Sequence, residues 1–134
     1  MRDLSYRVLW LSGGALLVAL VIVLSLMPNP QSVVPLSLQD KTGHLMAYCT
    51  LMAWFAGVWR RPSHWALALG FIALGITLEW LQCFVALRVF DPLDMVANAA
   101  GVAFGLLLSR AGLDRWCIYL ERSLGRVNRS VDGR

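Results

Sequence analysis

Charged residues are scarce in this chain of 134 residues: Asp, Glu, Lys and Arg make up 15% of it, whereas 58% is hydrophobic. Because a soluble globular domain carries about 25% charged residues, this composition excludes an ordinary soluble fold. The formal net charge is +4, but the arginines gather at the ends of apolar segments. That distribution indicates orientation in a membrane rather than binding of nucleic acid. The length allows one domain at most.

The common signatures of catalytic and cofactor sites are also missing. The chain contains no nucleophile elbow, HExxH pair, P-loop or dinucleotide fingerprint. We therefore predict no cofactor and no metal, and the lack of a closely spaced histidine pair argues against zinc in particular. The three cysteines form no CxxC pair and no disulfide framework. We expect reduced thiols, with Cys49 and Cys83 in the core.

Apolar segments long enough to cross a membrane occupy most of the chain. They cover residues 8–27, 41–59, 64–85 and 91–109. About 20 helical residues span a hydrocarbon core of roughly 30 Å, and short connections make neighbouring helices antiparallel. The sequence thus predicts an all-α membrane protein with four transmembrane helices in a domain of residues 1–110.

The segments outside these four differ in character. Residues 28–39 hold three of the five prolines, which excludes a regular helix there. Residues 111–134 form a basic tail in which apolar residues recur at helical spacing, and this pattern is typical of an amphipathic segment on a membrane surface. We expect residues 127–134 to be disordered.

Ten of the twelve Lys and Arg residues lie in the N-terminal segment, the connection at residues 60–61 and the C-terminal tail. Only Lys41 and Arg88 belong to the opposite side. Because positive residues stay in the cytoplasm, both termini are expected there. The segment ends at Lys41 and Arg88 are expected on the outside.

Polar residues interrupt the apolar segments at the predicted outer end, and we call this set the polar cluster. Its members are Lys41, His44 and Tyr48 in the second segment, Glu79 and Gln82 in the third, Asp91, Asp94 and Asn98 in the fourth, and Arg88 in the connection between these two. Within each segment they recur at spacings of three and four, which place them on one helix face. Charges at membrane depth are costly, so they usually face the bundle interior and mark function.

Three capping positions support the predicted helix starts. Asp40 stands where an N-cap of the second segment is expected, and Ser63 can cap the third. Asp91 precedes Pro92, and Asp followed by Pro is typical of the N-cap and first position of a helix. In the fourth segment Gly101-x-x-x-Gly105 predicts a close helix–helix contact.

The arrangement of these residues is similar to that of a known family. The matching pieces are Asp40-Lys41-x-x-His44-x-x-x-Tyr48, Glu79-x-x-Gln82, and Arg88-x-x-Asp91-x-x-Asp94-x-x-x-Asn98-x-x-Gly101-x-x-x-Gly105. They resemble the VanZ-like family of small integral membrane proteins over residues 40–105, with Ala86-Leu87 where members often carry Pro-Gly. The resemblance implies a bacterial multi-span protein named after an accessory factor in teicoplanin resistance. It brings no established reaction.

The members of the polar cluster leave two kinds of function open. As a binding site, the cluster would engage membrane lipids, a lipid-linked envelope precursor or a glycopeptide at the outer face. As the catalytic site of an intramembrane hydrolase or transferase, it would use Glu79, His44 or Asp94 for proton transfer and Arg88 to steady an anionic group. Each residue also has a structural alternative, such as an ion pair of Glu79 with Arg88 or Lys41. The missing nucleophile favours binding.

Overall fold

The computed structural model describes residues 2, 4–28, 38–85 and 90–131. Its elements are α1 (Arg7–Leu26), α2 (Leu38–Val58), the 3-10 turn η2 (Arg61–Ser63), α3 (His64–Gln82), α4 (Pro92–Arg110), the 3-10 turn η3 (Leu113–Arg115) and α5 (Trp116–Val131). Every regular element in these ranges is a helix, so the all-α prediction is confirmed. Three helical segments are long and apolar enough to cross a membrane: α1, the continuous run Arg61–Gln82 and α4. α2, which begins with several polar residues, is not among them.

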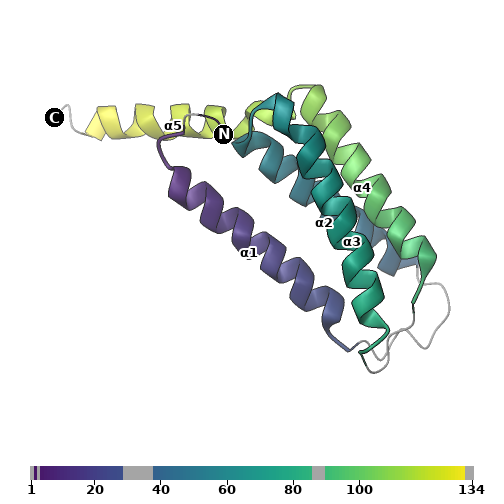
Figure 1. The fold of residues 1–134 in the computed structure, drawn as a ribbon. Helices are drawn as coiled ribbons and strands as arrows, with labels where there is room; N and C mark the ends of the chain where they lie inside the picture. The colour runs from purple at the N-terminus through teal and green to yellow at the C-terminus, as the bar shows by residue number, and fades with distance from the viewer. Residues whose placement is uncertain (1, 3, 29–37, 86–89, 132–134) are drawn as a thin grey trace.

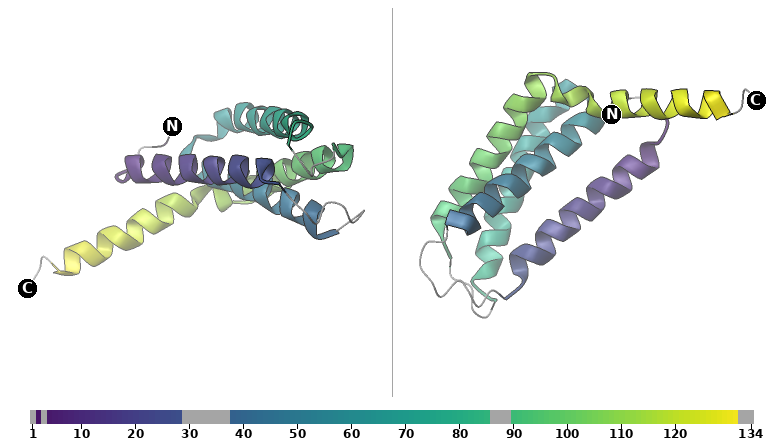
Figure 2. Two further views of the ribbon diagram at one scale, coloured as in Figure 1. Left: turned by 90° about the horizontal axis from the view of Figure 1, so that it is seen from below. Right: turned by 180° about the vertical axis from the view of Figure 1, so that it is seen from behind.

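The helices α1 to α4 run alternately up and down, and α5 leaves the bundle at a steep angle (Figures 1 and 2). The end of α2, the start of α3 and the end of α4 therefore lie at the same end of the bundle as α5. This end also carries most of the arginines, and we call it the arginine-rich end. The start of α2, the end of α3 and the start of α4 lie at the opposite end. The alternation matches the expected antiparallel arrangement of neighbouring helices.

α2 is the central helix, because it contacts α1, α3, α4, η3 and α5. Its residues Tyr48, Leu51, Met52 and Ala56 are buried and form one core with Ala68 and Phe71 of α3 and Val102 and Leu106 of α4. The neighbouring helices thus cover much of α2. A helix in this position can carry polar residues, since its surface contacts protein on several sides.

Glycines let α4 approach α2 closely. A Cβ atom at Gly101 would overlap the carbonyl oxygen of Leu45, and one at Gly105 would lie 2.7 Å from the carbonyl oxygen of Cys49. Gly14 plays the same part in α1, where a Cβ would lie 2.9 Å from the Phe55 ring. The close contact expected of Gly101-x-x-x-Gly105 is therefore present, and it brings the polar faces of α2 and α4 together.

Some predicted boundaries and caps are wrong. α2 begins at Leu38, so Asp40 lies within its first turn rather than before it. Ser63 has helical backbone angles and makes no side-chain cap, because η2 continues directly into α3. Residues 127–131, for which disorder is expected, belong to the last turns of α5, and the expected disorder of residues 127–134 stays a prediction. By contrast, Asp91 does cap α4: its side chain accepts a hydrogen bond from the Leu93 N–H at 2.9 Å.

The placement of the cysteines corrects another expectation. All three thiols are free, but Cys83 is exposed and Cys49 is partly buried, whereas Cys117 is fully buried. Cys83 follows the last residue of α3, so it lies beyond the packed length of that helix. Cys117 belongs to a second core with Trp10 and Val58, against which Trp54 and Trp116 pack. This core holds α5 to the bundle.

Candidate functional site

The structure brings together the described members of the polar cluster at the end of the bundle opposite α5. α2 contributes Lys41, His44 and Tyr48, α3 contributes Glu79 and Gln82, and the start of α4 contributes Asp91, Asp94 and Asn98. Glu79, Gln82, Asp94 and Asn98 are each at most 4% exposed, so their helices turn them toward protein. Arg88 lies outside the described residues, and so do residues 29–37 of the loop before α2.

Lys41 joins α2 to the start of α4. Its Nζ atom lies 2.5 Å from Asp91 Oδ2 and 2.9 Å from Asp94 Oδ1. The Asp91 side chain is 39% exposed and that of Asp94 only 6%, so the two pairs differ in their access to solvent. The Lys41 ammonium, followed by the Leu93 N–H, holds the pKa of Asp91 below its usual value. Hydrogen bonds to the charged form of a carboxyl group have this effect in general.

His44 is held by two residues of α4. Its Nδ1 atom lies 3.0 Å from Asn98 Oδ1, and its Nε2 atom lies 3.6 Å from Asp94 Oδ2. An amide oxygen only accepts hydrogen bonds, so this geometry assigns a proton to Nδ1 of His44. Nε2 is then the ring atom that faces the Asp94 carboxylate. Such an arrangement fixes the orientation of the ring and provides an acid–base group.

Glu79 connects the end of α3 to the start of α4. Its Oε1 atom accepts a hydrogen bond from the backbone N–H of Asp91 at 2.8 Å, and the residue is 1% exposed. The alternative of an ion pair between Glu79 and Lys41 is not what the structure shows, because Lys41 binds the two aspartates instead. The alternative ion pair of Glu79 with Arg88 stays a prediction, because Arg88 lies outside the described residues.

Three buried polar atoms of the cluster have no protein partner. They are Tyr48 Oη, Glu79 Oε2 and Gln82 Nε2; the one other such atom in the described part of the chain is His64 Nδ1. Gly75 lies beside one of them, since a Cβ at that position would lie 3.3 Å from Tyr48 Oη and 3.1 Å from Asn98 Nδ2. A buried polar group without a partner costs about 1–3 kcal/mol. The concentration of three in one place therefore calls for an explanation.

The cluster combines groups that donate and accept hydrogen bonds with groups that exchange protons. Gln82 Nε2 donates, a carboxylate oxygen of Glu79 accepts, and the Tyr48 hydroxyl does either. In the described residues no group of three His, Cys, Asp or Glu side chains is arranged to hold a metal ion. The arrangement fits recognition of a polar group by hydrogen bonds, and the pair of His44 and Asp94 adds the capacity for proton transfer.

A second polar site, at the arginine-rich end, was not expected from the sequence. Asp114 of η3 is 1% exposed and accepts hydrogen bonds from Arg2 at 2.6 Å and from Arg61 at 2.9 and 3.2 Å. Burial alone would raise the pKa of Asp114, but the hydrogen bonds from Arg61 and Arg2 outweigh it and hold the pKa below its usual value. The only signal in the sequence is Asp114 within a tail in which arginines outnumber acidic residues.

Glu121 of α5 completes the contacts at this end. Its carboxylate accepts hydrogen bonds from the backbone N–H groups of Ser5 and Tyr6 at 2.8 and 2.9 Å, and from Trp10 Nε1 at 2.8 Å. Burial alone would raise the pKa of Glu121, but these three donors outweigh it and hold the pKa below its usual value. α5 is thereby attached to the start of α1, which the amphipathic pattern alone did not predict.

Comparison with known proteins identifies no relative: no family model, no curated protein and no solved structure matches the chain. The resemblance to the VanZ-like family therefore stays a prediction. The chemistry of the site has to be argued from its own geometry.

Proposed function

We propose that this chain is a bacterial inner-membrane protein with four transmembrane helices and both termini in the cytoplasm. α2 has 21 residues, which is about 31 Å of helix at 1.5 Å per residue and enough to cross the hydrocarbon core. It lies among three helices that are themselves apolar enough to span. The concentration of arginines at one end supports the orientation. In this arrangement the polar cluster faces outward and α5 lies along the cytoplasmic surface.

We further propose that the polar cluster binds a polar part of an envelope component, in an accessory rather than a catalytic role. The observation that carries this proposal is the set of three unpartnered buried atoms, Tyr48 Oη, Glu79 Oε2 and Gln82 Nε2. A membrane protein gains nothing in stability from leaving such atoms without partners. A ligand that offers both donors and acceptors would satisfy all three, as the hydroxyl and amide groups of sugars and peptides do.

The ligand class follows from this chemistry and from the expected location. Lipid-linked cell-wall precursors and glycopeptides carry sugars and peptide amides, and both occur at the outer face of the membrane. The predicted relation to the VanZ-like family points to the same compounds. The ammonium group of Lys41 is already paired with the two aspartates. A ligand would therefore bind the cluster through hydrogen bonds more than through an ion pair with Lys41.

A catalytic role is the second candidate, and the geometry of His44 favours it. The ring is oriented by Asn98 and faces the Asp94 carboxylate at 3.6 Å, which is an arrangement suited to a general base acting on water. An intramembrane hydrolase or transferase would use it on a lipid or cell-wall precursor. No activated Ser or Cys nucleophile is present in the described part of the cluster, so binding remains the better-supported function.

The test compares wild type with three variants, Glu79→Gln, His44→Asn and Tyr48→Phe. Each protein is expressed in a teicoplanin-susceptible bacterium for tolerance measurements, and each is purified into lipid nanodiscs for titration with a lipid-linked peptidoglycan precursor and with teicoplanin. We expect wild type to bind one of the two probes and to raise tolerance. Tyr48→Phe and Glu79→Gln should weaken that binding about tenfold each, since each loses one hydrogen bond to the ligand.

Thr50→Val and Thr77→Val are matched controls, because they remove exposed hydroxyls that bind only their own helices, α2 and α3. They should leave binding and tolerance unchanged. If neither probe binds wild type, or if the three cluster variants match the controls, the binding proposal is wrong. Turnover of the precursor that His44→Asn abolishes would establish the enzyme instead.

A further inference from the structure

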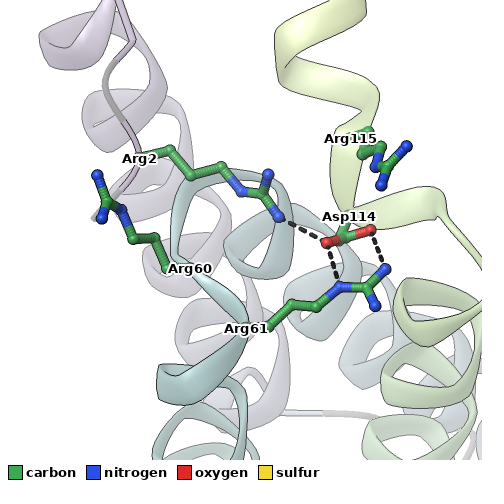
Figure 3. A pocket seen from close by; sticks show the side chains of 5 residues that line it. All are labelled: Arg2, Arg60, Arg61, Asp114 and Arg115. Carbon is green, nitrogen blue, oxygen red and sulfur yellow. Dashed lines mark hydrogen bonds and ion pairs between the residues drawn. The ribbon is translucent and has the colours of Figure 1, made fainter.

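A pocket of about 210 Å³ opens at the arginine-rich end of the bundle, far from the polar cluster. It is lined by Arg2 of the N-terminal segment, Arg60 and Arg61 of the α2–α3 connection, and Asp114 and Arg115 of η3 (Figure 3). Pockets for drug-sized ligands usually measure about 300–1,000 Å³, so this one suits a smaller group. The lining thus contains four arginines and a single carboxylate.

Asp114 positions two of these arginines without occupying all of their N–H donors. Its Oδ2 atom accepts hydrogen bonds from Arg2 Nη2 and Arg61 Nε, and its Oδ1 atom accepts one from Arg61 Nη2. A guanidinium group has five N–H donors in a fixed plane, and Arg61 directs two of them at Asp114. The Arg61 side chain is still 49% exposed, so it retains N–H groups that are accessible from the pocket.

Arg115 is the arginine best placed to receive a ligand. It is exposed, it lines the pocket, and Figure 3 draws no contact from it to Asp114. Its neighbour Asp114 already accepts three hydrogen bonds from Arg2 and Arg61. The positive charge of Arg115 is therefore not balanced by the one carboxylate of the pocket. An anion in the pocket would supply that balance, and a planar guanidinium binds phosphate oxygens in a bidentate manner.

The surroundings place the pocket at the level of lipid headgroups, if the proposed membrane arrangement holds. Five of the six tryptophans belong to this end of the bundle: Trp10, Trp54, Trp59, Trp65 and Trp116. Such concentrations of Trp are typical of membrane–water interfaces. α5 begins directly after Arg115 and extends away from the bundle (Figure 1), with Leu120 and Leu124 exposed one turn apart. An apolar stripe in this orientation fits the boundary between headgroups and acyl chains.

From these observations we propose that the arginine pocket binds the phosphate group of an anionic lipid headgroup. Basic pockets between membrane helices on the cytoplasmic side recognise lipid phosphates in this way. The inference rests on the proposed membrane placement, but it is independent of the ligand of the polar cluster. Anionic lipid would then hold together the N-terminal segment, the α2–α3 connection and η3.

Native mass spectrometry of the full chain, released from nanodiscs, tests this proposal. The nanodiscs contain phosphatidylcholine with either phosphatidylglycerol or phosphatidic acid, and inorganic phosphate is titrated into the detergent-solubilised protein in a separate arm. We expect wild type to retain anionic lipid in preference to phosphatidylcholine. Arg115→Gln should weaken this binding about tenfold, as expected for the loss of one charge-assisted contact. Arg115→Lys keeps the charge but not the bidentate geometry, so it should fall between the two.

Arg122→Gln is the matched control, because it removes the same charge from an exposed position of α5 outside the pocket. It should retain anionic lipid as wild type does. Equal losses in Arg115→Gln and Arg122→Gln would overturn the proposal in favour of unspecific attraction by the basic surface. Binding of inorganic phosphate without any preference for anionic lipid would assign the pocket to a soluble phosphate compound and overturn the lipid assignment. Neither result depends on the probes used for the polar cluster.

Discussion

The Nζ atom of Lys41 lies 2.9 Å from Oδ1 of Asp94, so the starts of α2 and α4 are joined by an ion pair within the bundle. The Asp94 carboxylate is 6% exposed and faces His44 with its other oxygen. The Asp94 carboxylate thus contacts both the Lys41 ammonium and the His44 imidazole. The same two helices are in close contact at Gly101, so packing and electrostatics act on one helix interface.

Replacing Lys41 by Met should destabilise the protein, because the buried Asp94 carboxylate then loses its main partner. We expect a decrease in the free energy of unfolding of about 2 kcal/mol, which is typical of hydrogen bonds to charged groups. Thermal unfolding of the purified protein in detergent measures this change. The double variant Lys41→Met/Asp94→Asn should recover part of the loss, because the unpaired charge is gone. Unfolding of Lys41→Met at the wild-type temperature would show that the pair contributes nothing.

Gly101→Ala should separate α2 from α4. The added Cβ would overlap the Leu45 carbonyl oxygen, which belongs to the backbone and has little freedom to move. Overpacking of this kind costs about 1–3 kcal/mol. Gly70→Ala in α3 is the matched control, since a Cβ there meets nothing within 4 Å, and it should be neutral or slightly stabilising. Equal unfolding temperatures for the two variants would contradict the close contact seen here.

The sequence was sufficient to predict that the described members of the polar cluster lie at one end of the bundle, but not the contacts of the arginine-rich end. Residues such as His44 and Tyr48 lie one turn apart, so helical spacing and depth predict their common direction. The site around Asp114 depends instead on contacts between residues 112 positions apart, as in the pair of Arg2 and Asp114. No periodic pattern encodes such a contact, and the arginines already had an explanation in membrane orientation.

The wrong prediction for Cys83 has a related cause. The apolar character of the third segment continues past Gln82, where α3 ends. Hydropathy therefore predicted that Cys83 is a buried residue of this helix, although it follows the last helical residue. Hydropathy also does not distinguish a helix surrounded by others from one that faces lipid. For this reason the central position of α2 became clear only from the three-dimensional packing.

The stability of the arginine-rich end should depend on pH through Asp114. Its pKa in the folded protein lies below its value in the unfolded chain, about 3.9, because Arg61 and Arg2 outweigh the opposing effect of burial. The ionised carboxylate therefore stabilises the fold above pH 4, and this contribution is lost as the pH falls through the folded pKa. Asp114→Asn should unfold at a lower temperature than wild type at pH 7, and the difference should shrink below pH 4. A difference that stays constant from pH 7 to pH 3 would contradict this account.

Labelling of cysteines tests both the burial of the thiols and the proposed topology. In detergent a maleimide should modify Cys83 quickly, and Cys117 only after unfolding, because the first is exposed and the second is buried. In intact cells a membrane-impermeant maleimide should reach Cys83 from outside. Arg122→Cys in a Cys83→Ser background should be labelled only after the membrane is permeabilised. The reverse pattern of labelling would overturn the proposed orientation.

Tyr48→Phe should separate stability from function in the polar cluster. The Tyr48 hydroxyl is buried and has no protein partner, so its removal relieves a desolvation cost of about 1–3 kcal/mol. We therefore expect the unliganded variant to be at least as stable as wild type in thermal unfolding. Binding of the envelope probe should nevertheless weaken, because the ligand loses the hydroxyl group that it would bind.

His44→Asn provides the contrast for this last prediction. His44 has partners in Asn98 and Asp94, so its replacement should lower both stability and binding. If the unpartnered groups of the cluster serve a ligand, Tyr48→Phe is the variant that should weaken binding without lowering stability. If Tyr48→Phe is as destabilising as His44→Asn and leaves probe binding intact, the hydroxyl serves the fold, and the argument from unpartnered atoms to a ligand fails.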